Sequence, residues 1–368
     1  MDTGQGGGSR LRQAACARYN PIAFPRGCIF RTTSLRAPMT QLPRIVVLAT
    51  GGTIAGAAGS AASSARYQAA TVPVATLLAA VPPLQTVARI EAEQVAQVDS
   101  KDMTFALWQT LAARVEYWSA QPGVAGIVIT HGTDTLEETA MALHLTQSCP
   151  VPVVLTAAMR PSTSLSADGP LNLLDAVRVA AHPDARGKGV LVVLNQQIHA
   201  ARDVAKAHTS AVDAFVSPCG PLGFVQDDYV RFTRSPRAAW TIGPMPAAWP
   251  VVEIVASYAQ PGRVAVDALV RAGVAGLVVA ASGNGSVHEV LAAALADAAA
   301  AGVAVVRSSR TGAGHVAIPP QASPADGVFV SAADLNPYKA RVLLAVALAA
   351  DAGLARDPGR LQAVFASA

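Results

Sequence analysis

The sequence predicts an α/β protein with a larger N-terminal domain, built on a mainly parallel sheet flanked by helices, and a smaller C-terminal α/β domain. The chain has 368 residues, whereas a single domain usually holds about 100–200. Short apolar β-branched runs, typical of strands buried on both faces, alternate with stretches of helical spacing. Strands and helices that alternate in this way form βαβ units, and therefore parallel sheets.

The composition excludes several classes of protein. Hydrophobic residues make up 52% of the chain, which is enough for sizeable cores and too much for a disordered protein. Four cysteines cannot staple a fold of this size, and no apolar run reaches the roughly 20 residues that cross a bilayer. The net charge is only +4 and aromatic residues make up 5%, so we expect no nucleic-acid partner and no membrane contact.

Residues 1–41 differ from the rest of the chain. They are rich in Gly, Arg, Ser and Thr, and they lack the apolar core of a secretory signal. Six arginines with one acidic residue would suit a transit-like peptide. We favour a disordered extension instead, or a natural start at Met39. The missing signal favours a cytoplasmic location over a periplasmic one.

The first domain is predicted over residues 42–230. Its strands are the apolar runs 45–49, 127–130, 153–156 and 190–194. Its clearest helices are 136–146, which has two glutamates in its first turn, and 171–181, which follows a Gly-Pro pair.

The second domain is predicted over residues 251–368, after a Pro-rich stretch at 231–250 that is interpreted as a linker. Its predicted strands are 251–255, 277–280, 303–306 and 328–330. Its predicted helices are 264–272, 287–301 and 337–350.

Two Gly-Thr loops follow predicted strands, at the strand ends where α/β sheets bind ligands. The first, TGGTIAG at 50–56, lacks the Lys of a phosphate-binding loop and the acidic residue of a dinucleotide site. Its Thr53 hydroxyl, held among glycines, suits a nucleophile, although a Thr here often caps a helix. The second loop, HGTDTLEETA at 131–140, has the same form, and Thr133 or Asp134 is likewise a candidate cap.

The remaining polar residues allow two interpretations. Lys206, in RDVAK at 202–206, is either a solvated surface charge or a catalytic amine. The seven histidines are dispersed and lack the spacing of metal ligands, so we expect no metal and no cofactor. His131 adjoins the second loop and is interpreted as structural.

Five segments resemble the L-asparaginases of the bacterial two-domain amidohydrolase family. They are TGGTIAG at 50–56, HGTDTLEETA at 131–140, AMRPSTSLSADGPLNLLDAV at 158–177, RDVAK at 202–206 and LNPYKARVLL at 335–344. The third segment is most like the type II branch, and the resemblance runs from about Leu42 to the C-terminus. It implies hydrolysis of L-asparagine to L-aspartate and ammonia through a β-aspartyl ester, without a metal.

The resemblance also implies the catalytic residues. Thr53 would attack the side-chain amide carbon, supported by Tyr67 in the loop that follows. Lys206 would complete a second cluster with Thr133 and Asp134. A threonine hydroxyl needs a base to take its proton, and either Tyr67 or Lys206 could serve.

Four further positions are implied to bind the substrate. Asp134 would hold the α-amino group and Ser100 the α-carboxylate. The backbone at Ala158 would lie near the leaving amide, and Gly52 would also bind the substrate. The tetrahedral oxyanion needs preorganised donors, which backbone amides of a Gly-rich loop can provide.

Lys101 and Gln260 depart from the family pattern. Type II relatives carry Gln or Glu where Lys101 stands, and that side chain helps to hold the substrate ammonium. A Lys would repel it, so we expect Lys101 to turn outward or to pair with Asp99 or Asp102. Gln260 replaces an Asn of one branch, in a stretch that reaches the neighbouring subunit's site.

The family resemblance implies a homotetramer of intimate dimers, with each site between the larger domain of one subunit and the smaller domain of its partner. Cys149 matches a disulfide position of some periplasmic relatives but finds no partner in 114–126, so we expect a free thiol. The substrate would be L-asparagine and possibly L-glutamine. The alternatives are a glutaminase-asparaginase, a related amidohydrolase, or a non-catalytic amino-acid sensor. The sensor would need the loss of Thr53 or Thr133.

Overall fold

The computed structural model describes residues 41–63, 66–237, 240–317 and 329–368, and residues Gln41–Ala368 group into one compact unit. The extension predicted at 1–41 therefore lies outside the described residues, apart from Gln41. No helix among the described residues is long and apolar enough to cross a membrane.

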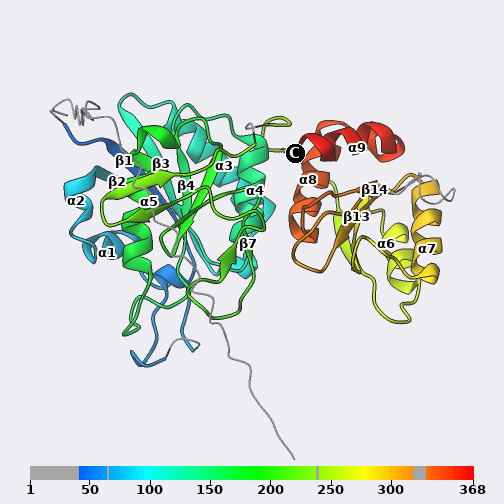
Figure 1. Cartoon of the computed structure of the whole chain (residues 1–368), viewed down its shortest axis with the longest axis horizontal. Coiled ribbons are helices and arrows are strands. Elements are labelled where there is room, and N and C mark those ends of the chain that lie inside the picture. Colours follow the sequence, from blue (N-terminus) through cyan, green and yellow to red (C-terminus); the bar gives the residue numbers. More distant parts are fainter. Residues whose placement is uncertain (1–40, 64–65, 238–239, 318–328) are drawn as a thin grey trace, which may run out of the picture. The chain divides into compact units, whose positions relative to one another are not determined.

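An eight-stranded sheet forms the centre of the larger domain (Figure 1), in the order β10-β9-β6-β5-β4-β3-β1-β2. Strands β2, β1, β3, β4 and β5 are parallel to one another, and β6, β9 and β10 each pair antiparallel with their neighbour. The strands are β1 Arg44–Gly51, β2 Arg89–Val98, β3 Val124–Thr130, β4 Val153–Thr156, β5 Val190–Leu194, β6 Gln197–Ala200, β9 Gly223–Gln226 and β10 Tyr229–Phe232.

Helices cover both faces of this sheet because its central strands are apolar on both sides. In β1, Val47 packs in one core with α1, α2 and α5, while the adjacent Val46 and Leu48 pack in another with α3 and α4. The helices are α1 Val74–Ala79, α2 Leu84–Val87, α3 Phe105–Ser119, α4 Leu136–Thr146 and α5 Gly169–Ala181. A separate antiparallel pair is formed by β7 Ala205–Lys206 and β8 Phe215–Val216.

The smaller domain has a four-stranded parallel sheet, in the order β11-β12-β13-β14. Helices α6 and α7 pack on one face, and α8 and α9 share a core with the other face. The elements are β11 Val252–Ala256, α6 Val264–Arg271, β12 Gly276–Ala281, α7 Glu289–Ala300, β13 Ala304–Ser309, β14 Val330–Ser331, α8 Pro337–Ala350 and α9 Pro358–Ser367.

One hydrophobic cluster joins the two sheet domains. Met141 and Leu145 of α4 are buried together with Leu343 and Val346 of α8. The contact places the first turn of α8 beside the first turn of α4, where the second Gly-Thr loop ends.

The predicted fold class is confirmed, with a larger, mainly parallel sheet followed by a smaller one. The bounds predicted for strands 153–156 and 190–194 and for helices 136–146 and 337–350 match the structure. The predicted strand 328–330 lies partly outside the described residues. The linker interpretation of 231–250 stays a prediction, although the side chains of Trp240, Ile242, Met245 and Trp249 pack against the shared cluster.

Candidate active site

The loops after β1 and β3 meet backbone to backbone at two glycines. A Cβ on Gly52, which has a φ of +79°, would lie 2.2 Å from the Cα of Gly132. A Cβ on Gly132 would lie 2.5 Å from Oγ of Ser100, in the turn after β2. The ends of three neighbouring parallel strands therefore converge because neither glycine carries a side chain.

Gly52 allows the two loops to come this close, but its backbone N–H is already used in a hydrogen bond. Its N–H already donates to the carbonyl oxygen of Val98 at 2.9 Å. The role of Gly52 in substrate binding stays a prediction.

Thr53 follows Gly52 and begins a single 3-10 turn, Thr53–Ala55. The residue is only 5% exposed, and its Oγ1 lies 2.7 Å from the phenolic oxygen of Tyr67. Paired backbone hydrogen bonds between Ala57 and Gln68 close the intervening loop beside Tyr67. The hydroxyl predicted as nucleophile and the predicted phenol are thus in direct contact.

The second Gly-Thr loop forms the other predicted cluster. Nζ of Lys206 donates to Oγ1 of Thr133 at 2.9 Å and to Oδ1 of Asp134 at 2.6 Å. Oγ of Ser100 accepts from the backbone N–H of Asp134 at 3.1 Å, which joins this loop to the turn after β2. Thr133 is 5% exposed, whereas the side chain of Asp134 is about half exposed.

Lys101 is paired with acidic side chains on its own turn. Its Nζ lies 2.6 Å from Asp99 and 3.2 Å from Asp102, and its side chain is 61% exposed. Hydrogen bonds to Asp99 and then Asp102 raise the pKa of Lys101. Lys101 is therefore paired with Asp99 and Asp102, as we expected from the repulsion between a lysine and the substrate ammonium.

The segment that contains Ala158 lies against the turn of Thr53. Ala158 is fully buried, and a Cβ on Gly169 would contact both Ala158 and Ile54. Ser162 strengthens this contact, because its backbone N–H and its hydroxyl both donate to the carbonyl oxygen of Gly56. The sequence analysis singled out this segment by its family resemblance and did not predict these hydrogen bonds.

His131 holds the second Gly-Thr loop through contacts on both ring nitrogens. The residue is fully buried, with Nδ1 2.7 Å from the carbonyl oxygen of Gly132 and Nε2 3.0 Å from Oγ1 of Thr139. Burial lowers the pKa of His131 to about 4, so the ring is neutral near pH 7. These contacts support the structural interpretation. Among the described residues, no group of three or more His, Cys, Asp or Glu side chains is arranged to hold a metal ion.

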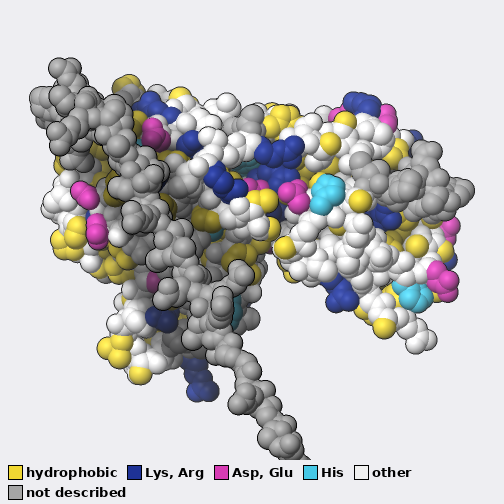
Figure 2. Space-filling model, in the orientation of Figure 1, with side chains coloured by type: hydrophobic (Ala, Val, Ile, Leu, Met, Phe, Trp, Pro, Cys, Tyr) yellow, Lys and Arg dark blue, Asp and Glu magenta, His cyan; other side chains and the backbone are white. Residues whose placement is uncertain are grey.

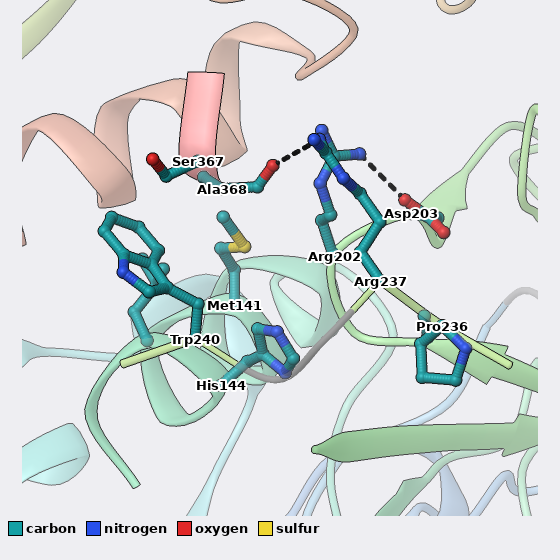
Figure 3. A pocket seen from close by; sticks show the side chains of 11 residues that line it. Met141, His144, Arg202, Asp203, Pro236, Arg237, Trp240, Ser367 and Ala368 are labelled. Carbon is teal, nitrogen blue, oxygen red and sulfur yellow. Dashed lines mark hydrogen bonds and ion pairs between the residues drawn. The ribbon is translucent and has the colours of Figure 1, made fainter. Parts of the chain in front are cut away.

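A separate small cavity, shown in Figure 3, has neither Thr53 nor Thr133 in its lining. Its lining includes Met141 and His144 of α4, Trp240, and the guanidinium groups of Arg202 and Arg237. Its volume is about 20 Å³, which is enough for a water molecule and too little for an amino acid. The threonine loops remain the better candidate for chemistry on a small substrate.

The fold and the site together define an α/β enzyme with two buried threonine hydroxyls at the carboxyl edge of a parallel sheet. Residues 44–238 match the family model of the asparaginase N-terminal domain, and residues 251–365 match that of the glutaminase/asparaginase C-terminal domain. The chain therefore belongs to the asparaginase family.

Similar proteins cover nearly the whole chain. The sequence is 43% identical over 332 residues to the glutaminase-asparaginase of Pseudomonas fluorescens biotype A, which covers 89% of this chain and 91% of that one. It is 43% identical over 336 residues to a probable periplasmic L-asparaginase of Haemophilus influenzae, covering 89% and 94%. The crystal structure of a probable cytoplasmic L-asparaginase from Campylobacter jejuni matches with a TM-score of 0.83 and 42% identity, covering 89% and 100%.

Proposed function

We propose that this protein hydrolyses L-asparagine to L-aspartate and ammonia through a threonine nucleophile. The observation that carries the proposal is a pair of buried threonines on two loops that are in contact. Each threonine has beside it a side chain that can exchange a proton. Thr53 lies against the phenol of Tyr67, and Thr133 against the ammonium of Lys206. The activities of the similar bacterial proteins support the same conclusion.

In the first half of the reaction, Oγ1 of Thr53 attacks the side-chain amide carbon, its proton passes to the phenolic oxygen of Tyr67, and Tyr67 passes its own proton on to the amide nitrogen. The C–N bond breaks and ammonia leaves, so that a β-aspartyl ester remains on Thr53. In the second half, Thr133 and Lys206 orient a water molecule that attacks this ester, the bond to Oγ1 of Thr53 breaks, and Thr53 takes a proton from the water as aspartate is released. Acid–base groups within hydrogen-bond reach of the reacting atoms make both transfers feasible.

Ser100 and Asp134 are suited to hold the backbone groups of the substrate. The Asp134 carboxylate uses Oδ1 for Lys206, and its half-exposed side chain can offer Oδ2 to the α-ammonium. Oγ of Ser100 accepts from the Asp134 N–H, which leaves its own hydrogen to donate to the α-carboxylate. Ala158 is proposed to lie beside the leaving amide.

Hydrolysis of L-glutamine is the second candidate activity, favoured by the identity to the glutaminase-asparaginase. Ammonia release from L-asparagine and from L-glutamine, measured on the same preparation, tests both. Faster release from asparagine supports the proposal, and no release from either amide would overturn it.

We further propose a homotetramer of intimate dimers in the cytoplasm. The smaller domain exposes Tyr258, Val264 and Val290, side chains suited to a subunit contact. Cys149 and Cys219 are free thiols, which is typical of a reducing compartment. On the face shown in Figure 2, basic side chains lie among acidic and neutral ones rather than in one stripe, as expected for a protein that acts on a small molecule. Light scattering of the purified protein and fractionation of the producing cell test the two statements.

A further inference from the structure

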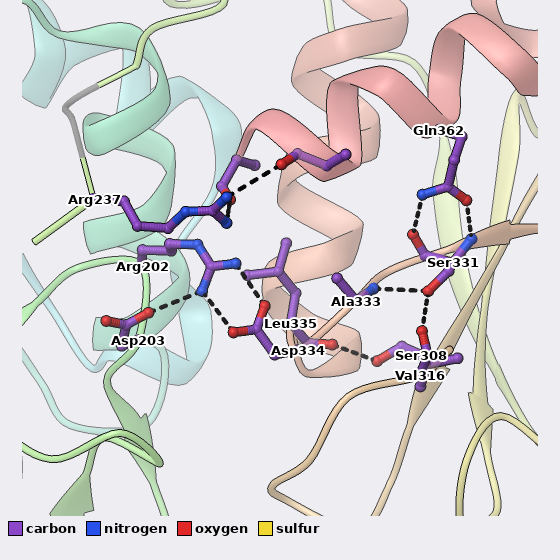
Figure 4. A network of polar contacts seen from close by, with 12 residues as sticks. Arg202, Asp203, Arg237, Ser308, Val316, Ser331, Ala333, Asp334, Leu335 and Gln362 are labelled. Atoms are coloured by element: carbon purple, nitrogen blue, oxygen red, sulfur yellow. Dashed lines mark hydrogen bonds and ion pairs between the residues drawn. The ribbon is translucent and has the colours of Figure 1, made fainter. Parts of the chain in front are cut away.

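The segment 202–206, which ends in Lys206, is tied at its beginning to the smaller domain. Arg202 is 8% exposed, and its guanidinium pairs with both carboxylate oxygens of Asp334, at 3.1 and 2.5 Å (Figure 4). The same group donates to Asp203 at 2.9 Å. A bidentate pair of this kind fixes direction as well as distance.

The end of the same segment is held by Glu137, in the first turn of α4. The backbone N–H of Lys206 donates to Oε2 of Glu137 at 2.7 Å. The other carboxylate oxygen, Oε1, accepts from Nδ2 of Asn336 at 2.9 Å, and Asn336 caps the start of α8. Glu137 is only 6% exposed, and its carboxylate joins the segment of Lys206 to the smaller domain through two part-buried hydrogen bonds.

Lys339 supports Glu137 from the first turn of α8. It is 2% exposed, and its Nζ donates to the carbonyl oxygens of Glu137, at 3.1 Å, and of Ala201. Burial lowers the pKa of Lys339 to about 8, while the nearby Glu137 carboxylate opposes this shift. A lysine buried this deeply is costly unless its polar atoms are well paired. Here it links the start of α4 to the residue before Arg202.

We propose that Glu137 is a positioning residue for Lys206, and that Asn336 and Lys339 of the smaller domain hold Glu137 in place. The inference rests on the proposed function, in which Lys206 acts on Thr133. Nζ of Lys206 must reach both Thr133 and Asp134, so its placement depends on where the backbone of residue 206 is fixed. A displacement of about 1 Å at a catalytic group can cost 10²-fold in rate.

The first test compares Glu137→Gln with Glu138→Gln. Glu138 is the matched control, because it also faces α8, 3.8 Å from Arg341, and the structure records no contact between it and Lys206. Glu137→Gln keeps one acceptor oxygen for two donors, so either the Lys206 N–H or the Asn336 amide must face an NH2 group. We expect kcat to fall about 10- to 100-fold while KM changes much less. Glu138→Gln should keep the wild-type kcat.

A double-mutant cycle separates positioning from a general loss of structure. In the Lys206→Met background, Glu137→Gln should cause no further fall in kcat, because its effect passes through the missing amine. Losses that multiply, or equal losses in Glu137→Gln and Glu138→Gln, would overturn the inference.

Asn336→Ser tests whether the smaller domain helps to position residues 202–206, and this test does not require the Glu137 variant to fold. Serine keeps a cap for α8 but is too short to reach Glu137. Amide hydrogen exchange should become faster at residues 202–206 in this variant, a readout that needs no activity. Unchanged exchange would overturn the role of Asn336. If the wild type is inactive but Asn336→Ser still shows the faster exchange, only the proposed function is refuted.

Discussion

Replacing Gly52 by alanine tests whether the two threonine loops must touch. The new Cβ would lie 2.2 Å from the Cα of Gly132, whereas an ordinary contact begins at 3.4 Å, so the loops must separate by about 1.2 Å. Alanine is also disfavoured at the φ of +79° and ψ of −169° of Gly52, by about 1–3 kcal/mol. With about 1–3 kcal/mol for overpacking, we expect the free energy of unfolding to fall by about 2–6 kcal/mol.

The substitution should also slow catalysis, because Thr53 follows Gly52 directly. A shift of this size predicts a fall in kcat of about 100-fold in an ammonia-release assay, with the variant still folded. Gly59→Ala is the matched control, since a Cβ there meets nothing within 4 Å. A Gly52→Ala enzyme with wild-type kcat and Tm would refute the backbone contact between the loops.

Three further predictions concern single side chains. Thr53→Ala and Thr133→Val should each lower kcat by roughly 10³-fold or more with a normal melting curve, and an unchanged kcat would remove that residue from the mechanism. Lys101→Gln should lower KM for asparagine, because a neutral side chain can turn toward the substrate ammonium; a KM that is unchanged or raised would contradict this. The pKa of His131 is lowered from 6.5 to about 4, so between these values the unfolded chain binds more protons and stability falls as pH falls, by about 3 kcal/mol in all. Urea unfolding at pH 7.5 and 4.5 should show a smaller difference for His131→Gln than for the wild type, and an equal difference would argue against a buried neutral ring.

The sequence predicted best those elements whose residues are buried on every side. The run 153–156, Val-Val-Leu-Thr, is buried at every position and forms β4 with the predicted bounds. By contrast, β2 was not predicted, because it lies at the sheet edge and carries Arg89, Glu91 and Glu93 among its apolar residues. An edge strand with one wet face resembles a polar loop when read alone.

In the candidate active site, features set by residues close in sequence were predictable, and contacts between distant residues were not. Its two Gly-Thr loops were predictable because each follows an apolar strand, and Lys101 because its acidic partners are close in sequence. The contact between Glu137 and Asn336 was not predictable, since 199 residues separate them. A glutamate in the first turn of a helix is ordinarily explained by the helix dipole alone.

The long separation between Glu137 and Asn336 also sets an order of events during synthesis. A growing chain that has passed Lys206 already carries both threonine loops, Tyr67 and the lysine itself. It still lacks the amide of Asn336 and the amine of Lys339, which emerge from the ribosome only with the last part of the smaller domain. In an unfinished chain the backbone N–H of Lys206 can therefore already meet Glu137, but the groups of the smaller domain that hold Glu137 are added last.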